Sequence, residues 1–242
     1  MPASEPPCRD SLPDGLPRGL EAALATLALL ALSPLAVVLA ACVKASSRGP
    51  VLFRQTRVGR HGRTFVLLKL RTMRSNEPGS TSVPAPQVTA AGDRRITGFG
   101  RLLRATKLDE LPQLWHVARG EMSLVGPRPE VPAYVDLDEP LWRRVLAARP
   151  GLTDPTTLRL RDEEILLARS AEKLGRDPAT VYRERLLPLK LQLSARYLEK
   201  RSAGSDLRVL LGTLASIVRR PRVPELEELE LEVREPAGTG PA

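Results

Sequence analysis

The stretch "AALATLALLALSPLAVVLAACV", residues 22–43, is a run of 22 residues without a charged side chain. At a rise of about 1.5 Å per residue it would form roughly 33 Å of helix, enough to cross the hydrocarbon core of a bilayer. The run is only weakly apolar, because eight of its residues are alanine and ten are leucine or valine. Pro34 cannot donate a hydrogen bond to the carbonyl of Leu30, so a bend is expected at Ser33-Pro34. A kinked helix that spans the membrane and a helix that enters one leaflet and returns fit these residues equally well.

The two flanks of this segment differ in charge. Before it, two arginines are outweighed by four acidic residues, whereas nine basic residues and no acidic one occur from Lys44 to Arg74. Positive flanks stay in the cytoplasm, which places the chain after residue 44 there and holds it against anionic lipid headgroups. A lipoprotein signal ending at Cys42 is disfavoured, because the positive leader that such a signal needs is missing.

The composition limits the class of partner. The chain has 242 residues, 42% of them hydrophobic but only 3% aromatic, and a formal net charge of +9. Of 37 basic residues only six are lysine, and arginine suits bidentate contacts to phosphates and carboxylates. A nucleic acid, an anionic membrane or a phosphorylated substrate could each account for this, as could a GC-rich genome. Two cysteines and two distant histidines argue against a disulfide framework and against a histidine zinc cluster.

The remaining chain mixes a short hairpin with helices. Apolar runs at 51–53 and 65–68, joined by a turn at 59–62, predict a β-hairpin. Residues 75–93 are rich in Pro, Ser, Thr and Gly, which predicts a mobile loop. Helices are predicted over much of 139–148, 160–201 and 205–220. The last of these has one apolar side, which could pack in the core or lie in the membrane interface.

The sequence "TKLDELPQLW", residues 106–115, places two carboxylates side by side, Asp109 and Glu110. We expect Asp109 to be the N-cap of a helix that runs to about Arg119 and stops at Gly120. Pro112 then falls in the first turn, where no backbone donor is needed. Such a pair can simply complement the helix dipole. Alternatively, arginines and the helix N-terminus would keep Asp109 ionised, so that it could attack phosphorus in a substrate whose charge Mg²⁺ neutralises.

Three blocks carry a resemblance to a known family. They are "FRQTRVGRHGRTFVLLKLRTM" (53–73), "DRRITGFGRLLRATKLDELPQLWHVARGEMSLVGPRPE" (93–130) and "RPGLTD" (149–154). In this order and spacing the chain resembles, over roughly residues 18–220, the bacterial sugar transferase family, small monotopic phosphoglycosyl transferases of polyprenyl-phosphate pathways. The resemblance implies transfer of a sugar 1-phosphate from a UDP-sugar to a polyprenyl phosphate with release of UMP. It implies an enzyme of the bacterial cytoplasmic membrane that initiates polysaccharide or glycoconjugate assembly.

The resemblance also assigns residues. It implies that Asp109 is the nucleophile, that Glu110 assists it, and that both hold the Mg²⁺ cofactor. Substrate contacts are implied at basic and proline positions, and Ser33-Pro34 matches the break that makes the membrane helix re-entrant. The substrate-binding positions are Lys69, Arg71, Pro127, Arg128 and Pro129.

The predicted fold is therefore α+β and mostly helical: an N-terminal re-entrant membrane helix followed by a small cytoplasmic catalytic domain that contains a short β-hairpin. We expect a disordered N-terminal tail at 1–17, the membrane-inserted helix at 18–45, the catalytic domain at 46–222 and an acidic, partly disordered tail at 223–242. A homo-oligomer and downstream glycosyltransferases are compatible further partners.

Two alternatives and two departures from the family stay open. A membrane-tethered nucleic-acid binder would need aromatic residues among its basic ones for base stacking, which the 3% aromatic content disfavours. A non-catalytic scaffold is the other alternative, although the carboxylate pair is intact. The segment "RPGLTDPTTLRLRDEE" lacks the glycine, aromatic and glutamine that many relatives have, and the insertion before Asp93 is long. Both departures fall where a sugar or an acceptor could bind, so the sugar is not identified.

Overall fold

The computed structural model describes residues 12–13, 15–74, 93–218 and 222–234. The predicted mobile loop at 75–93, apart from Asp93, and most of the predicted N-terminal tail lie outside the described residues.

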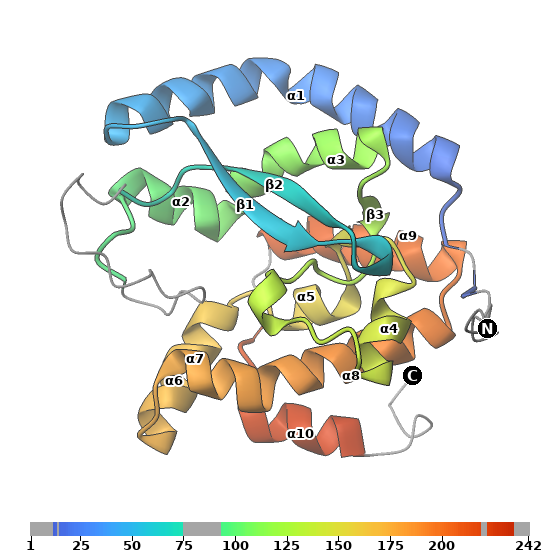
Figure 1. Cartoon of the computed structure of the whole chain (residues 1–242). Coiled ribbons are helices and arrows are strands. Elements are labelled where there is room, and N and C mark those ends of the chain that lie inside the picture. Colours follow the sequence, from blue (N-terminus) through green and yellow to red (C-terminus); the bar gives the residue numbers. More distant parts are fainter. Residues whose placement is uncertain (1–11, 14, 75–92, 219–221, 235–242) are drawn as a thin grey trace, which may run out of the picture.

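A single long helix, α1 (Arg18–Ser46), arches over one side of the molecule (Figure 1). Within the described ranges it is the one helix long and apolar enough to cross a membrane, with a mean hydropathy of 2.4. Pro34 lies inside it, and the hydroxyl of Ser33 donates to the carbonyl of Leu30 at 2.8 Å. That carbonyl is the one that Pro34 leaves without a backbone donor. The side chains of Leu30 and Val37 are 67% and 70% exposed, which suits a helix embedded in lipid.

Both ends of α1 are attached to the same domain. Near its start, the carboxylate of Glu21 is buried and accepts a hydrogen bond from the backbone N–H of Leu124 at 2.9 Å. Near its end, the guanidinium of Arg71 donates to the carbonyls of Val43 at 3.2 Å and Ser47 at 2.6 Å. Since buried polar groups are costly to leave unpaired, these bonds fix the helix against the domain at two distant points.

The hairpin predicted from the sequence is confirmed. Strands β1 (Leu52–Val58) and β2 (Thr64–Leu70) pair antiparallel and are joined through the short helical turn η1 (Arg60–Gly62). A second pair, which the sequence did not predict, joins β3 (Ser123–Val125) to β4 (Gly151–Thr153) in parallel. The backbones approach so closely there that a Cβ on Gly151 would lie 2.1 Å from the nitrogen of Gly126. Glycine is therefore required at this crossing, which joins the segment before Arg128 to the "RPG" segment.

Helices make up most of the domain, as predicted. They are α2 (Gly98–Thr106), η2 (Leu108–Gln113), α3 (Leu114–Arg119), η3 (Pro132–Tyr134), α4 (Pro140–Leu146), α5 (Pro155–Arg159), α6 (Glu163–Leu174), α7 (Pro178–Val181), the π-helical turn η4 (Tyr182–Leu186), α8 (Leu187–Glu199), α9 (Ala203–Val218) and α10 (Leu226–Arg234).

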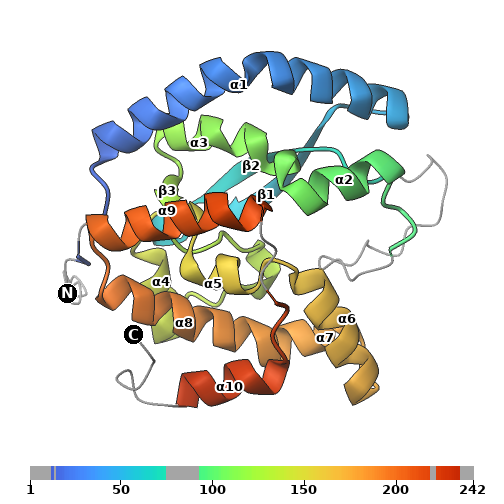
Figure 2. The same ribbon diagram turned by 180° about the vertical axis from the view of Figure 1, so that it is seen from behind.

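The main apolar core lies on the side of the molecule away from α1, where α4, α6, α8 and α10 meet (Figure 2). It includes the buried side chains of Trp142 and Leu186. Within the predicted acidic tail, α10 packs Leu226, Leu229 and Val233 into this core. Those three residues recur at helical spacing, so one face of an otherwise acidic segment is apolar.

The sequence left open whether residues 205–220 pack in the core or lie in the membrane interface, and helix α9 answers this. Its inner face is packed in the domain, where Asp206 and Val209 are 0% and 7% exposed. Its outer face carries Leu207, Leu211 and Leu214, each more than half exposed. The helix thus packs on the core with one side and presents an apolar stripe with the other.

Candidate active site

The two carboxylates lie in η2, a 3₁₀ helix, and not at the start of an α-helix. The expectation that Asp109 is an N-cap is therefore wrong. Lys107 ends α2 in the left-handed conformation, with φ of 59°, and the chain turns directly into η2. The N–H of Glu110 donates to the carbonyl of Lys107, so no side-chain cap is needed. The predicted stop at Gly120 is confirmed, with φ of 86° at the end of α3.

Glu110 is bound by two of the predicted basic residues. Its Oε1 accepts from Lys69 Nζ at 2.9 Å and from Arg128 at 2.5 Å, although the three positions come from β2, η2 and the loop after β3. Burial raises the pKa of the Glu110 carboxyl, but the charges of Arg128 and Lys69 outweigh it and hold that pKa well below its ordinary value. Glu110 is thus the carboxylate of the pair that the protein itself keeps ionised.

Asp109 has a different environment. Its side chain is 6% exposed, and Oδ1 is buried without a hydrogen-bond partner among the described residues. Burial and the neighbouring charge of Glu110 raise the pKa of the Asp109 carboxyl. This corrects the expectation that nearby cations favour the ionised form of Asp109: the charges of Lys69, Lys107 and Arg104 lower the pKa of its carboxyl, but burial and Glu110 outweigh them. An unpaired buried oxygen beside an anion favours a cationic partner at this point.

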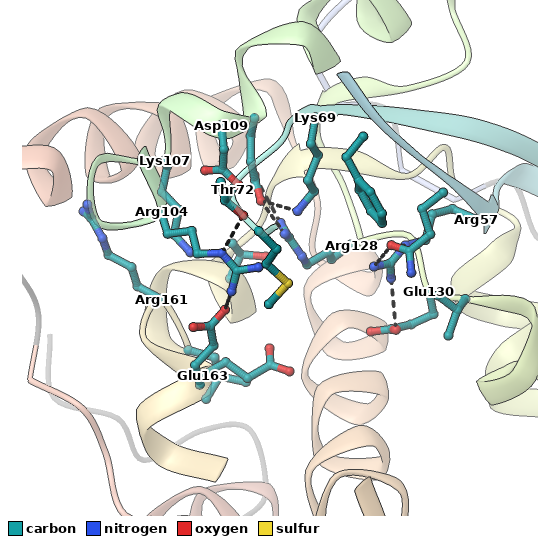
Figure 3. A pocket seen from close by; sticks show the side chains of 18 of the residues that line it. Arg57, Lys69, Thr72, Arg104, Lys107, Asp109, Arg128, Glu130, Arg161 and Glu163 are labelled. Carbon is teal, nitrogen blue, oxygen red and sulfur yellow. Dashed lines mark hydrogen bonds and ion pairs between the residues drawn. The ribbon is translucent and has the colours of Figure 1, made fainter. Parts of the chain in front are cut away.

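A cavity of about 1330 Å³ adjoins the carboxylates. Figure 3 shows Asp109 between two groups of cations, with Lys107 and Arg104 on one side and Lys69 and Arg128 on the other. Twelve of the lining residues are basic and seven are acidic, so the cavity favours a polyanionic ligand. The basic lining residues are Arg54, Arg57, Lys69, Arg71, Arg74, Arg95, Arg101, Arg104, Lys107, Arg128, Arg161 and Lys190.

Three of the other predicted contacts have structural partners. Arg71 lines the cavity, but its guanidinium also donates to the carbonyl of Pro50 as well as to the end of α1. Pro127 lines the cavity and accepts from the N–H of Gly151 through its carbonyl, while the carbonyl of Pro129 accepts from Arg57. In this structure these residues hold the walls of the site together.

The sequence reasoning missed a buried ionic cluster on the opposite wall. Lys190 contacts Glu130 at 3.0 Å, Glu163 at 3.2 Å and the hydroxyl of Tyr182 at 2.9 Å. Burial lowers the pKa of the Lys190 ammonium, but the two carboxylates outweigh it and raise that pKa well above its ordinary value. Glu130 belongs to the "GPRPE" motif, and this position could have marked it as a site residue. Lys190 lies 60 residues from Glu130 in the sequence and carries no such signal.

His116 links the helix after the carboxylates to the strand that carries Lys69. Its Nε2 accepts from the backbone N–H of Leu68 at 3.2 Å, and its Nδ1 lies 2.6 Å from Glu121. The ring is buried against Phe65, with the two rings edge to face. The tautomer that satisfies both contacts carries its proton on Nδ1.

We expect His116→Leu to destabilise the protein by about 1–3 kcal/mol, because it leaves the N–H of Leu68 without an acceptor. Thermal unfolding measured in detergent checks this. Glu121→Gln is the matched control: it keeps the bond to Leu68 and should shift the melting temperature much less. Equal shifts for the two variants would contradict the assigned role of Nε2.

A divalent cation fits the carboxylate pair only with help from a ligand. Among the described residues there is no group of three or more His, Cys, Asp or Glu side chains arranged to hold a metal. Two adjacent carboxylates, one with an unpaired buried oxygen, supply part of an octahedral oxygen shell, and phosphate oxygens and water would supply the rest. The donor set therefore suits Mg²⁺ bound together with a phosphorylated substrate.

Comparison with known proteins gives a consistent result. A family model described as bacterial sugar transferase matches residues 14–220. A UDP-glucose:undecaprenyl-phosphate glucose-1-phosphate transferase of Caulobacter vibrioides is 38% identical over 204 residues, which are 83% of this chain and 69% of the relative. A protein of the same description from Escherichia coli is 45% identical over 141 residues, covering 57% of this chain and 30% of the relative.

A relative from Aeromonas hydrophila is described with a different sugar. It is a UDP-N-acetylgalactosamine-undecaprenyl-phosphate N-acetylgalactosaminephosphotransferase, 37% identical over 139 residues, which are 56% of this chain and 32% of the relative. The chain thus spans about a third of the length of two of these three relatives.

Proposed function

The chain belongs to the bacterial sugar transferase family, and from that premise we propose that it transfers a sugar 1-phosphate from a UDP-sugar to a polyprenyl phosphate and releases UMP. The observation that carries the proposal is the unpaired, buried oxygen of Asp109, which lies beside a cation-bound carboxylate on the wall of a basic cavity. Relatives described with glucose and with N-acetylgalactosamine support the reaction class and leave the sugar open.

The proposed chemistry has two steps at one phosphorus atom. In the first, an oxygen of Asp109 forms a bond to the phosphorus that carries the sugar. The bond from that phosphorus to the bridging oxygen breaks, and its electron pair leaves with UMP. In the second, an oxygen of the polyprenyl phosphate attacks the same phosphorus, the bond to Asp109 breaks, and the carboxylate is regenerated. The product is a polyprenyl diphosphate sugar.

The other residues bind and orient. Lys69 and Arg128 hold Glu110 and present their remaining N–H groups to phosphate oxygens near Asp109. Glu110, with its depressed pKa, suits the role of a fixed anion better than that of a proton acceptor. We propose that Asp109 and Glu110 would hold Mg²⁺ together with the substrate. When bound, the ion would neutralise charge on the phosphates and favour the ionised form of Asp109.

We further propose that α1 is re-entrant and that the domain faces the cytoplasm. A helix whose two ends bind the same domain has both ends on one side of the bilayer. Pro34, where a bend is expected, lies near the middle of the helix, and the turn inside the leaflet is needed there. The excess of basic residues after the helix favours the cytoplasmic side.

The topology predicts that tags at residue 2 and at residue 240 are both protected from a membrane-impermeant reagent in intact cells. Labelling after the cells are permeabilised is the control for tag accessibility. Labelling of the tag at residue 2 in intact cells would mean that the helix spans the bilayer.

The reaction is tested by measuring UMP release from a panel of UDP-sugars. With purified protein and Mg²⁺, the correct donor should give a burst of about one UMP per enzyme before any lipid acceptor is added. Steady turnover should then require polyprenyl phosphate. Turnover with lipid but without a burst would favour direct transfer between the two substrates and contradict the covalent step.

A further inference from the structure

The strand that follows the membrane helix carries an exposed aromatic residue into the cavity. Phe53, on β1, lines the cavity and is 48% exposed. It lies directly opposite Lys69 in the register of the hairpin, and Lys69 contacts the carboxylate of Glu110. Side chains opposite each other in an antiparallel pair have Cβ atoms about 5 Å apart. An apolar ring is therefore held beside the group that contacts Glu110.

This part of the cavity wall is continuous with the membrane helix. Val51 and Leu52, just before Phe53, pack against a buried cluster that includes Leu39 and Val43 near the end of α1. Both residues also line the cavity. Val51 and Leu52 thus connect the apolar cluster at the end of α1 to the part of the cavity wall that Phe53 lines.

Cations flank the apolar wall. Arg54 follows Phe53 on β1, and Arg101 projects from α2; both are exposed and both line the cavity. An apolar strip beside basic residues suits an amphiphile with an anionic head and a hydrocarbon chain.

We propose that Phe53 and the strip formed by Val51 and Leu52 bind the first isoprene units of the polyprenyl phosphate acceptor, an inference that rests on the proposed function. The position of the Phe53 ring distinguishes the isoprene chain of the acceptor from the uracil of the donor as its contact. Hydrocarbon joins the acceptor phosphate through a single oxygen, whereas uracil is separated from the diphosphate by a ribose. An apolar contact directly across the hairpin from Lys69, the lysine that we propose contacts the phosphates, therefore fits an isoprene unit better than the base.

The kinetic test uses Phe53→Ser, with Phe53→Leu as the conservative variant. We expect Phe53→Ser to raise KM for undecaprenyl phosphate about tenfold, because most of one apolar contact is lost. The UMP burst and KM for the UDP-sugar should stay unchanged, and Phe53→Leu should recover most of the loss. The rise in acceptor KM should be equally large with farnesyl phosphate, which has the same first isoprene units. A slower burst or a raised donor KM would assign Phe53 to the uracil and overturn the proposal.

Val66→Ser is the matched control. Val66 is 49% exposed on the same hairpin but does not line the cavity, so its replacement should change neither KM. An equal rise of acceptor KM in the two variants would mean that hairpin stability, and not a contact at Phe53, controls lipid use.

A second measurement needs no turnover. With para-benzoylphenylalanine at position 53, irradiation with undecaprenyl phosphate in detergent micelles should give a lipid adduct, detected by mass spectrometry, that farnesyl phosphate suppresses. The same group at position 66 should give several-fold less adduct. Equal adduct at both positions would overturn the proposal. An adduct specific to position 53 in a protein that releases no UMP with any donor would overturn the proposed reaction and leave the lipid contact standing.

Discussion

Asp109→Asn is expected to eliminate the UMP burst and to lower sugar phosphate transfer by at least about 10³-fold, because an amide cannot form the bond to phosphorus. The change is nearly isosteric and removes a charge from a buried oxygen that has no partner among the described residues. Stability should therefore be unchanged or slightly improved. A quenched-flow measurement of UMP, together with thermal unfolding of the same preparation, separates the two effects.

Asp162→Asn is the matched control for this variant. Asp162 is a half-buried aspartate that lines the same cavity. It lies at the start of α6, where its side chain makes no capping hydrogen bond. The Asp162→Asn variant should therefore retain most of the UMP burst. Retention of the burst in Asp109→Asn would rule out Asp109 as the nucleophile.

Glu110→Gln is expected to reduce both stability and activity. The substitution leaves Lys69 and Arg128 in a mostly buried site without the anion that both contact. Removing one member of a buried ionic group costs about 3–5 kcal/mol, and partial exposure of Arg128 places the expected loss near the lower end. Chemical denaturation of the detergent-solubilised protein measures the loss of stability, and UMP release measures the loss of activity.

Two further variants serve as controls for the stability loss of Glu110→Gln. Glu184→Gln breaks an ion pair with Arg176 in which both side chains are about half exposed, and it should cost less than about 1 kcal/mol. Adding Lys69→Met to Glu110→Gln removes one of the unpaired cations and should recover part of the stability without recovering activity. If the double variant is no more stable than Glu110→Gln alone, the ionic group does not account for the loss.

Much of the fold could be predicted because its signals are local. The uncharged run around Pro34, the hairpin turn at Gly59–Gly62 and the stop at Gly120 each follow from a few adjacent residues. The parallel pair of β3 and β4 could not be predicted, since three-residue strands leave no periodic pattern. Helix α10 left a signal, three apolar residues at helical spacing, that the dominant acidic composition concealed.

The sequence selected residues that the fold brings together, but it did not predict the charge environment of the two carboxylates. Asp109, Glu110, Lys69 and Arg128 were selected from motifs, and the fold brings all four to one wall of the cavity. Which carboxylate the cations contact depends on side-chain directions in a 3₁₀ turn, and the sequence does not encode these locally. For the same reason the cluster around Lys190 was missed, since its partners are separated by up to 60 residues.

The two-point attachment of α1 has a mechanical consequence. A protein held by one flexible anchor would sample a range of heights above the bilayer. A membrane helix that is bound to the domain near both of its ends would instead hold the domain at one height and one tilt. The cavity would then stay level with the lipid phosphates, so a water-soluble nucleotide and a water-insoluble carrier could meet in a layer only a few ångströms deep. Neither substrate would have to leave its own phase.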